Sequence, residues 1–213
     1  MENQNHAFNY AYLLKQVKAR VLLAQKKAIY TANEEMLSMY WDIGKLLSES
    51  QKQIGWGNNA LEKLANDLKN DYPEMKGFSV RNCQFMIQFY NEYNQQLTNT
   101  KRAVSYLNNN EIVLPISKLG WSHNITLMQR TKDIKARYWY MIQCLKNGWS
   151  RDFLIEAIKQ DYYHSHGALA SNFDTTLPEI QAKQVKETLK DPYIFDMLTF
   201  TEEYDERPIE LGL

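Results

Sequence analysis

Residues 57–93 read GNNALEKLANDLKNDYPEMKGFSVRNCQFMIQFYNEY and hold two short helical patterns separated by a compact turn. In the first pattern, after a cap at Asn58 or Asn59, apolar residues recur at the i, i+3, i+4, i+7 spacing of one helix face: Leu61, Leu64, Ala65 and Leu68. Pro73 cannot continue a helix and disfavours helical geometry at Tyr72, so we expect the first helix to end there.

A second helix is expected to follow the turn. Gly77 can take a left-handed conformation, Phe78 can pack over the helix start, and Ser79 can cap the helix. The inward stripe is Cys83, Met86, Phe89/Tyr90 and Tyr93, and the polar residues lying largely off it are Arg81, Asn82, Gln84 and Gln88. A helix, a tight turn and a polar second helix form the helix-turn-helix layout, although two packed helices of an ordinary α domain would give the same pattern.

Composition places the chain among soluble globular proteins. It has 213 residues, of which 44% are hydrophobic and 23% charged. No run of eighteen apolar residues and no secretory leader occurs, so we expect no membrane contact and a cytoplasmic location. Cys83 and Cys144 both fall on predicted core faces, which favours two buried thiols over a disulfide.

The net charge of zero conceals an asymmetry along the chain. Residues 171–213 hold 4 Lys/Arg and 10 Asp/Glu, whereas the preceding 170 residues hold 21 and 15. A mildly basic body with an acidic C-terminal segment is compatible with nucleic-acid binding, and solvated surface charge explains it equally well.

Residues 1–56 are expected to form a long N-terminal helical segment. Apolar residues follow helical spacing from Tyr10 to Ala28 and again from Met36 to Leu47. Either one helix of some forty residues runs through, or two helices meet near residues 31–33; we favour one long or gently kinked helix. Such a helix needs an extended partner, which an antiparallel helix or a second copy of the protein would supply.

The rest of the chain is predicted to be mainly helical too. Residues 95–118 form the least helical part and suit a loop or small hairpin, at the position of the wing in a winged helix. Helical patterns return at Ser122 and after Asp133; Gly148 is a natural left-handed cap and Ser150 caps a further helix. The predicted fold is therefore mainly α, with one or two helix-turn-helix units, winged or not, and a long N-terminal helix.

Four stretches carry a family resemblance: WGNNALEKLANDLKNDYPEMKGFSVRNCQFMIQFY, NGWSRDFL, SNFDTTLP and KDPYIFDML. In this order and spacing they resemble the N-terminal region of bacterial YhcG-like proteins, from about residue 10 to the C-terminus. The resemblance implies an all-α domain credited with DNA binding, followed by a PD-(D/E)XK nuclease domain. The helical patterns give a long N-terminal helical segment at 1–56 and a helix-turn-helix domain at 57–170, and the resemblance implies that the acidic segment at 171–213 begins a nuclease domain absent from this chain.

Catalysis is not expected within these 213 residues. A PD-(D/E)XK site needs an Asp and an Asp/Glu-x-Lys element on adjacent strands to hold Mg²⁺ and activate water, and no such element with strand-like flanks occurs. We therefore expect no cofactor here, with Mg²⁺ required only by the missing nuclease domain. His164 and His166 lack further metal ligands nearby, and His166 stands where the family commonly has Arg. A pairing of Cys144 with His123 or His164 lacks an oxyanion hole.

The candidate DNA contacts lie at two helix starts. Arg81, Asn82, Gln84 and Gln88 suit base edges, while Lys76 and the Ser79 end of the helix suit phosphate. Arg151 and Lys159 form a second candidate surface. Core roles are expected for the tryptophans Trp56, Trp121, Trp139 and Trp149 rather than base stacking.

Two functions follow from these patterns. The first is a non-catalytic DNA-binding or positioning domain of a nuclease protein, whose partners are DNA and its own C-terminal nuclease domain. The alternative is an oligomerisation or adaptor domain that makes no direct DNA contact and uses the N-terminal helix, for example to form a homodimer. Salt-sensitive DNA binding distinguishes the first from the second.

Overall fold

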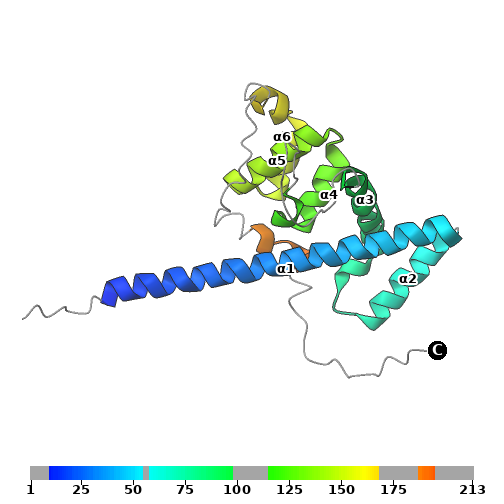
Figure 1. Ribbon diagram of the computed structural model, residues 1–213, viewed down its shortest axis with the longest axis horizontal. Helices are drawn as coiled ribbons and strands as arrows, with labels where there is room; N and C mark the ends of the chain where they lie inside the picture. Colours follow the sequence, from blue (N-terminus) through cyan, green and yellow to red (C-terminus); the bar gives the residue numbers. More distant parts are fainter. Residues whose placement is uncertain (1–9, 55–57, 98–114, 168–186, 195–213) are drawn as a thin grey trace, which may run out of the picture. The chain divides into compact units, whose positions relative to one another are not determined.

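A computed structural model describes residues 10–54, 58–97, 115–167 and 187–194, and all the regular structure in these ranges is helical (Figure 1). The elements are α1 (Tyr10–Ile54), α2 (Asn58–Asp71), the 3₁₀ turn η1 (Lys76–Phe78), α3 (Val80–Leu97), the 3₁₀ turn η2 (Ile116–Lys118), α4 (Trp121–Arg130), α5 (Ile134–Asn147), α6 (Arg151–Lys159) and the π-helical turn η3 (Tyr163–Gly167). The mainly α prediction is confirmed. The loop or hairpin predicted at residues 95–118 is described only at its ends, where residues 95–97 belong to α3 and residues 116–118 form η2; residues 98–114 lie outside the described residues.

Helix α1 runs without interruption for 45 residues, which confirms the single long helix (Figure 1). Residues 31–33 contain no break. Burial along α1 is uneven, because every side chain from Tyr10 to Gln25 is exposed, whereas Met36, Leu37, Tyr40 and Leu47 are buried. Tertiary packing therefore buries the later part of α1, whereas the side chains of its first turns are exposed.

The chain divides into two compact units that interleave in sequence. One unit comprises residues 1–37 and 107–189, and the other comprises residues 38–106 and 190–213. These limits do not coincide with the predicted boundaries at residues 56 and 170. The difference arises because α1 contributes residues to both units, which a division by consecutive segments cannot represent.

In the unit that contains α2 and α3, one core joins these helices to the later part of α1. Leu47, Leu61 and Cys83 form a buried cluster. Trp41 packs edge-on against Phe89 at 5.6 Å and against Tyr90 at 5.2 Å between ring centroids. All five residues predicted for the inward stripe of α3 are buried, so that prediction is confirmed.

The other unit is built on α4, α5 and α6 and confirms the predicted helix ends. Gly148 ends α5 with φ 60° and ψ 49°, a left-handed conformation. Ser150 caps α6, since its hydroxyl accepts a hydrogen bond from the Phe153 amide at 3.2 Å. The side-chain amide of Asn33 donates to the Ser117 and Leu119 carbonyls at 2.8 and 3.0 Å, which ties α1 to the segment before α4.

The two cysteines are separate buried thiols, as predicted. Both are free and fully buried, and burial raises the pKa of each thiol. Because the thiolate is the reactive form, we expect neither cysteine to react with an aromatic disulfide reagent in the native protein and both to react in denaturant. Rapid modification of either thiol under native conditions would contradict this burial.

Candidate nucleic-acid interface

The connection between α2 and α3 is a compact turn. Helix α2 ends at Asp71, just before Tyr72 and Pro73, as Pro73 predicted. The Tyr72 amide donates to the Leu68 carbonyl at 2.8 Å, and the Met75 amide donates to the Tyr72 carbonyl at 3.0 Å. Helices α2 and α3 pack against each other after this turn (Figure 1). The order helix, turn, helix is therefore present.

Ser79 caps α3 in the predicted way. Its hydroxyl accepts a hydrogen bond from the Asn82 amide at 3.2 Å. The expected left-handed conformation of Gly77 is wrong, since the positive-φ glycine among the described residues is Gly148. Gly77 instead allows a close approach, because a Cβ there would lie 2.6 Å from the buried Tyr40 hydroxyl.

Asn82 is not part of the exposed face, so its prediction as a base contact is wrong. Its side chain is 1% exposed, and its amide nitrogen donates to the Gly77 carbonyl at 2.6 Å. The sequence did contain the signal: Asn82 precedes Met86 by four residues and Phe89 by seven, which is the spacing of one helix face. The residue belongs to the support of the turn.

Four of the predicted contact residues remain exposed around the start of α3, namely Lys76, Ser79, Arg81 and Gln84. The guanidinium carbon of Arg81 lies 5.5 Å from the centre of the Phe85 ring, an arrangement that holds the side chain against the helix. Phe85 was not singled out, although it follows Arg81 by four residues, a spacing that brings side chains together on a helix. Gln88 is half-buried and donates to the Glu92 carboxylate at 2.5 Å.

The second candidate surface carries acidic neighbours. Arg151 pairs with Asp152 at 3.1 Å, and Lys159 lies 3.6 Å from the Glu156 carboxylate. All four side chains are exposed, so these pairs contribute little to stability but reduce the local positive charge. The electrostatic attraction for phosphate at this surface is correspondingly weak.

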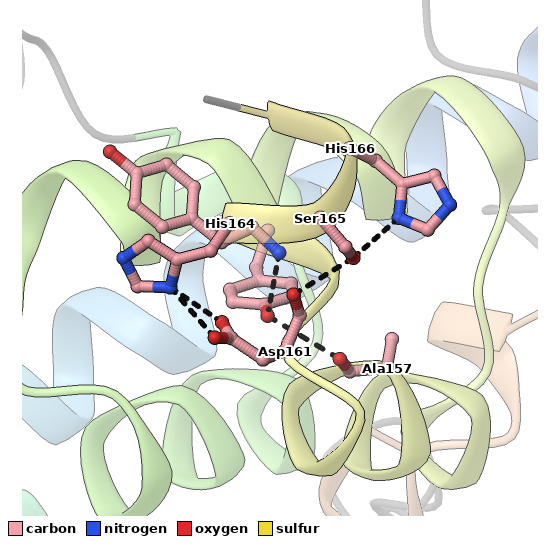
Figure 2. A network of polar contacts seen from close by, with 7 residues as sticks. Ala157, Asp161, His164, Ser165 and His166 are labelled. Carbon is pink, nitrogen blue, oxygen red and sulfur yellow. Dashed lines mark hydrogen bonds and ion pairs between the residues drawn. The ribbon is translucent and has the colours of Figure 1, made fainter. Parts of the chain in front are cut away.

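The histidines at η3 face apart. The Nδ1 atom of His164 lies 2.7 and 2.9 Å from the two carboxylate oxygens of Asp161, while Nδ1 of His166 lies 2.8 Å from the Ser165 hydroxyl (Figure 2). The two rings point to opposite sides of the turn in Figure 2, because this segment is a π-helical turn and not a strand. Within the described ranges, no three His, Cys, Asp or Glu side chains are grouped to hold a metal ion.

The remaining side chains of the candidate sites are packing residues. Trp121 is fully buried, and Trp139 and Trp149 are half-buried and meet edge-on at 6.3 Å. His123 is buried, with Nε2 2.9 Å from the Trp149 carbonyl oxygen. Trp56 lies outside the described residues.

Comparison with known proteins shows which family this chain belongs to. Residues 16–165 match the model of the DUF1016 N-terminal domain. The chain belongs to the DUF1016 family through that domain.

One curated relative supports the YhcG-like resemblance. The chain is similar to a protein of Escherichia coli (strain K12) described as "Putative nuclease YhcG", with 23% identity over 216 residues. The match covers 89% of this chain and 56% of the relative, so the chain spans about half the length of that protein. No solved structure gives a significant match. Among the described residues, no helix has the length and apolar character that a membrane span requires.

Proposed function

We propose that this domain binds duplex DNA through the start of α3 and positions a nuclease domain on it, without catalysis of its own. The observation that carries the proposal is the exposed set Lys76, Arg81 and Gln84 at the capped start of a helix that packs on α2 across a tight turn. Helix-turn-helix proteins place the early residues of the second helix in the major groove. The nuclease role rests on the printed description of the Escherichia coli relative.

Each of the three residues has a distinct role in the proposal. Arg81 suits the two acceptors of guanine, and its contact with Phe85 limits its rotational freedom before binding. Gln84, one turn further along α3, suits adenine. Lys76 in η1 meets a phosphate together with the free amides at the helix start.

The salt dependence is expected to be shallow. Between residues 71 and 84 the positively charged side chains are Lys76 and Arg81, and the exposed carboxylates Asp71 and Glu74 lie in the same stretch. With about two phosphate charges neutralised, affinity should fall about tenfold between ~50 and ~200 mM salt. A much steeper dependence would indicate a larger basic surface elsewhere.

The test is a titration of labelled duplex DNA with wild-type and variant chains, followed by fluorescence anisotropy. Arg81→Ala should weaken binding about tenfold, because one bidentate base contact is worth about 1–3 kcal/mol. Arg81→Lys keeps the positive charge but loses the planar guanidinium group that can donate two hydrogen bonds to one base. This variant should therefore retain non-specific DNA binding and lose sequence preference. Lys45→Ala removes an exposed charge from α1 and serves as the control. Equal affinities for Arg81→Ala and Lys45→Ala would contradict the proposal.

The alternative function, an oligomerisation or adaptor domain, is favoured by a separate observation. Eight large apolar side chains in the first turns of α1 are exposed, by 36% to 70%. Monomeric soluble proteins rarely expose large apolar patches, and such a patch often marks an interaction site. The two functions are compatible, since the exposed surface and the start of α3 lie in different compact units.

A further inference from the structure

The chain returns to the unit that contains α2 and α3 after residue 189. This unit comprises residues 38–106 and 190–213, and the structure describes residues 190–194 of the second part. Within this short segment, Ile194 is 1% exposed and Asp191 is 3% exposed. Residues distant in sequence from α3 are therefore packed into the unit that holds the proposed DNA contacts.

Residues 191–194 begin a helical turn, and residue type explains where it starts. Asp191 stands at the N-cap position: its carboxylate accepts a hydrogen bond from the Tyr193 amide at 3.2 Å, and its carbonyl accepts one from the Ile194 amide at 3.1 Å. Pro192 occupies the first helical position, where proline is favoured because its fixed φ suits a helix and its missing N–H would have no helical partner. The turn therefore holds the Tyr193 side chain in a defined direction.

The ring of Tyr193 lies on the connection between α2 and α3. It meets the buried ring of Tyr40 edge-on, with 6.4 Å between the ring centroids. Its Cδ1 atom is 3.9 Å from the point that a Cβ on Gly77 would occupy. The Gly77 carbonyl also accepts the hydrogen bond from the Asn82 side chain in the first turn of α3. Tyr193 therefore packs against the same turn that presents the proposed DNA contacts.

We propose that Tyr193 is a positioning residue that holds residues 191–194 against the α2–α3 turn, so that this docking and DNA binding at the start of α3 strengthen each other. The coupling rests on the proposed function, in which the nuclease domain follows this segment in the chain. Both events require an ordered η1, so either one removes part of the ordering cost of the other. The docked segment would also fix where the nuclease domain is attached relative to bound DNA.

The expected coupling is modest. An edge-to-face aromatic pair shifts an equilibrium by between about twofold and tenfold beyond the effect of its buried area. Tyr193→Ala removes the ring and should weaken binding of labelled duplex DNA by about threefold to tenfold, although it changes no charge. Tyr193→Phe keeps the ring and should bind nearly as tightly as wild type. Tyr10→Ala is the matched control, because it removes an exposed tyrosine from the other compact unit.

Hydrogen exchange supplies the second measurement, because coupled equilibria are reciprocal. The amides of Tyr193 and Ile194 are both bonded to Asp191, so their exchange reports opening of the docked turn. Saturating duplex DNA should slow exchange at these two amides by the same factor by which Tyr193→Ala weakens DNA binding. The amides of α5, in the other unit, serve as the control and should not respond. A residue that only stabilised the fold would not produce equal factors.

The outcomes separate this coupling from the proposed function. Wild type that binds duplex DNA with unchanged exchange at Tyr193 and Ile194 would overturn the coupling alone, as would Tyr193→Ala that binds as tightly as Tyr10→Ala. Wild type that binds no duplex DNA would overturn the proposed function, and the coupling with it. In the protein without DNA, Tyr193→Ala should accelerate exchange at Ile194. Unaltered exchange there would show that the ring does not hold the segment, which would also overturn the proposal.

Discussion

Replacing Gly44 with alanine is expected to lower the free energy of unfolding by about 3 kcal/mol or more. Gly44 lies in α1 where this helix touches the backbone of α3. A Cβ at this position would overlap the Met86 carbonyl oxygen and would lie 2.6 Å from the Met86 carbonyl carbon. Backbone atoms of a packed helix cannot rotate away as a flexible side chain can, so the two helices must separate.

The direction in which Gly44→Ala changes the free energy of unfolding distinguishes the contact with α3 from helix propensity. In a helix without tertiary contacts, this change is expected to stabilise by about 1 kcal/mol, because alanine has the higher helix propensity. A loss of stability therefore reports the contact with α3 directly. Urea denaturation measures it, with Lys45→Ala as a control at the exposed neighbouring position. A Gly44→Ala protein as stable as wild type would show that α1 and α3 do not approach so closely.

Asn82→Ala should lower the free energy of unfolding by about 2 kcal/mol. The Asn82 side chain is almost fully buried and donates to the Gly77 carbonyl at 2.6 Å. Its removal leaves the buried Gly77 with a carbonyl that has lost this donor. The turn that presents Lys76 and Arg81 would then lose part of its support. DNA binding would therefore weaken indirectly, because the turn is less stable and not because a DNA contact is lost.

Gln84→Ala is the matched control for Asn82→Ala. Gln84 lies two residues further along α3 and is exposed, so its substitution should change stability by less than about 0.5 kcal/mol. Under the proposed function, Gln84→Ala alters base preference without altering stability. Asn82→Ala lowers stability without altering base preference. An unaltered unfolding midpoint for Asn82→Ala would contradict the supporting role of Asn82.

Local patterns in the sequence were sufficient to predict most of the helices. The stripe from Cys83 to Tyr93 repeats at helical spacing, and all its members are buried. The caps at Ser79, Ser150 and Gly148 involve only neighbouring backbone groups, so residue type and position were enough to predict them. The continuous α1 was likewise correct, because no proline interrupts it.

The candidate site was predicted less well than the helices, in one case because a local spacing was overlooked and in another because the contact is not local. Asn82 was grouped with its polar neighbours by residue type, yet its position one turn before Met86 places it in the core. Gly77 was assigned a left-handed conformation, the commonest reason for a glycine in a turn, whereas the nearby Tyr40 hydroxyl explains it. Tyr40 lies 37 residues earlier in the chain, so no local pattern could have indicated this contact.

By itself, the sequence determined the helical class, the helix ends, the buried stripes and the family, because all of these depend on spacing and residue type along the chain. The tertiary structure alone decided that α1 contributes to two units, that α3 touches the backbone at Gly44, and that the first turns of α1 remain exposed. These features arise where segments distant in sequence meet or fail to meet. The spacing of apolar residues predicts that a helix has an apolar face. Only the tertiary structure shows which of these faces are buried and which are exposed.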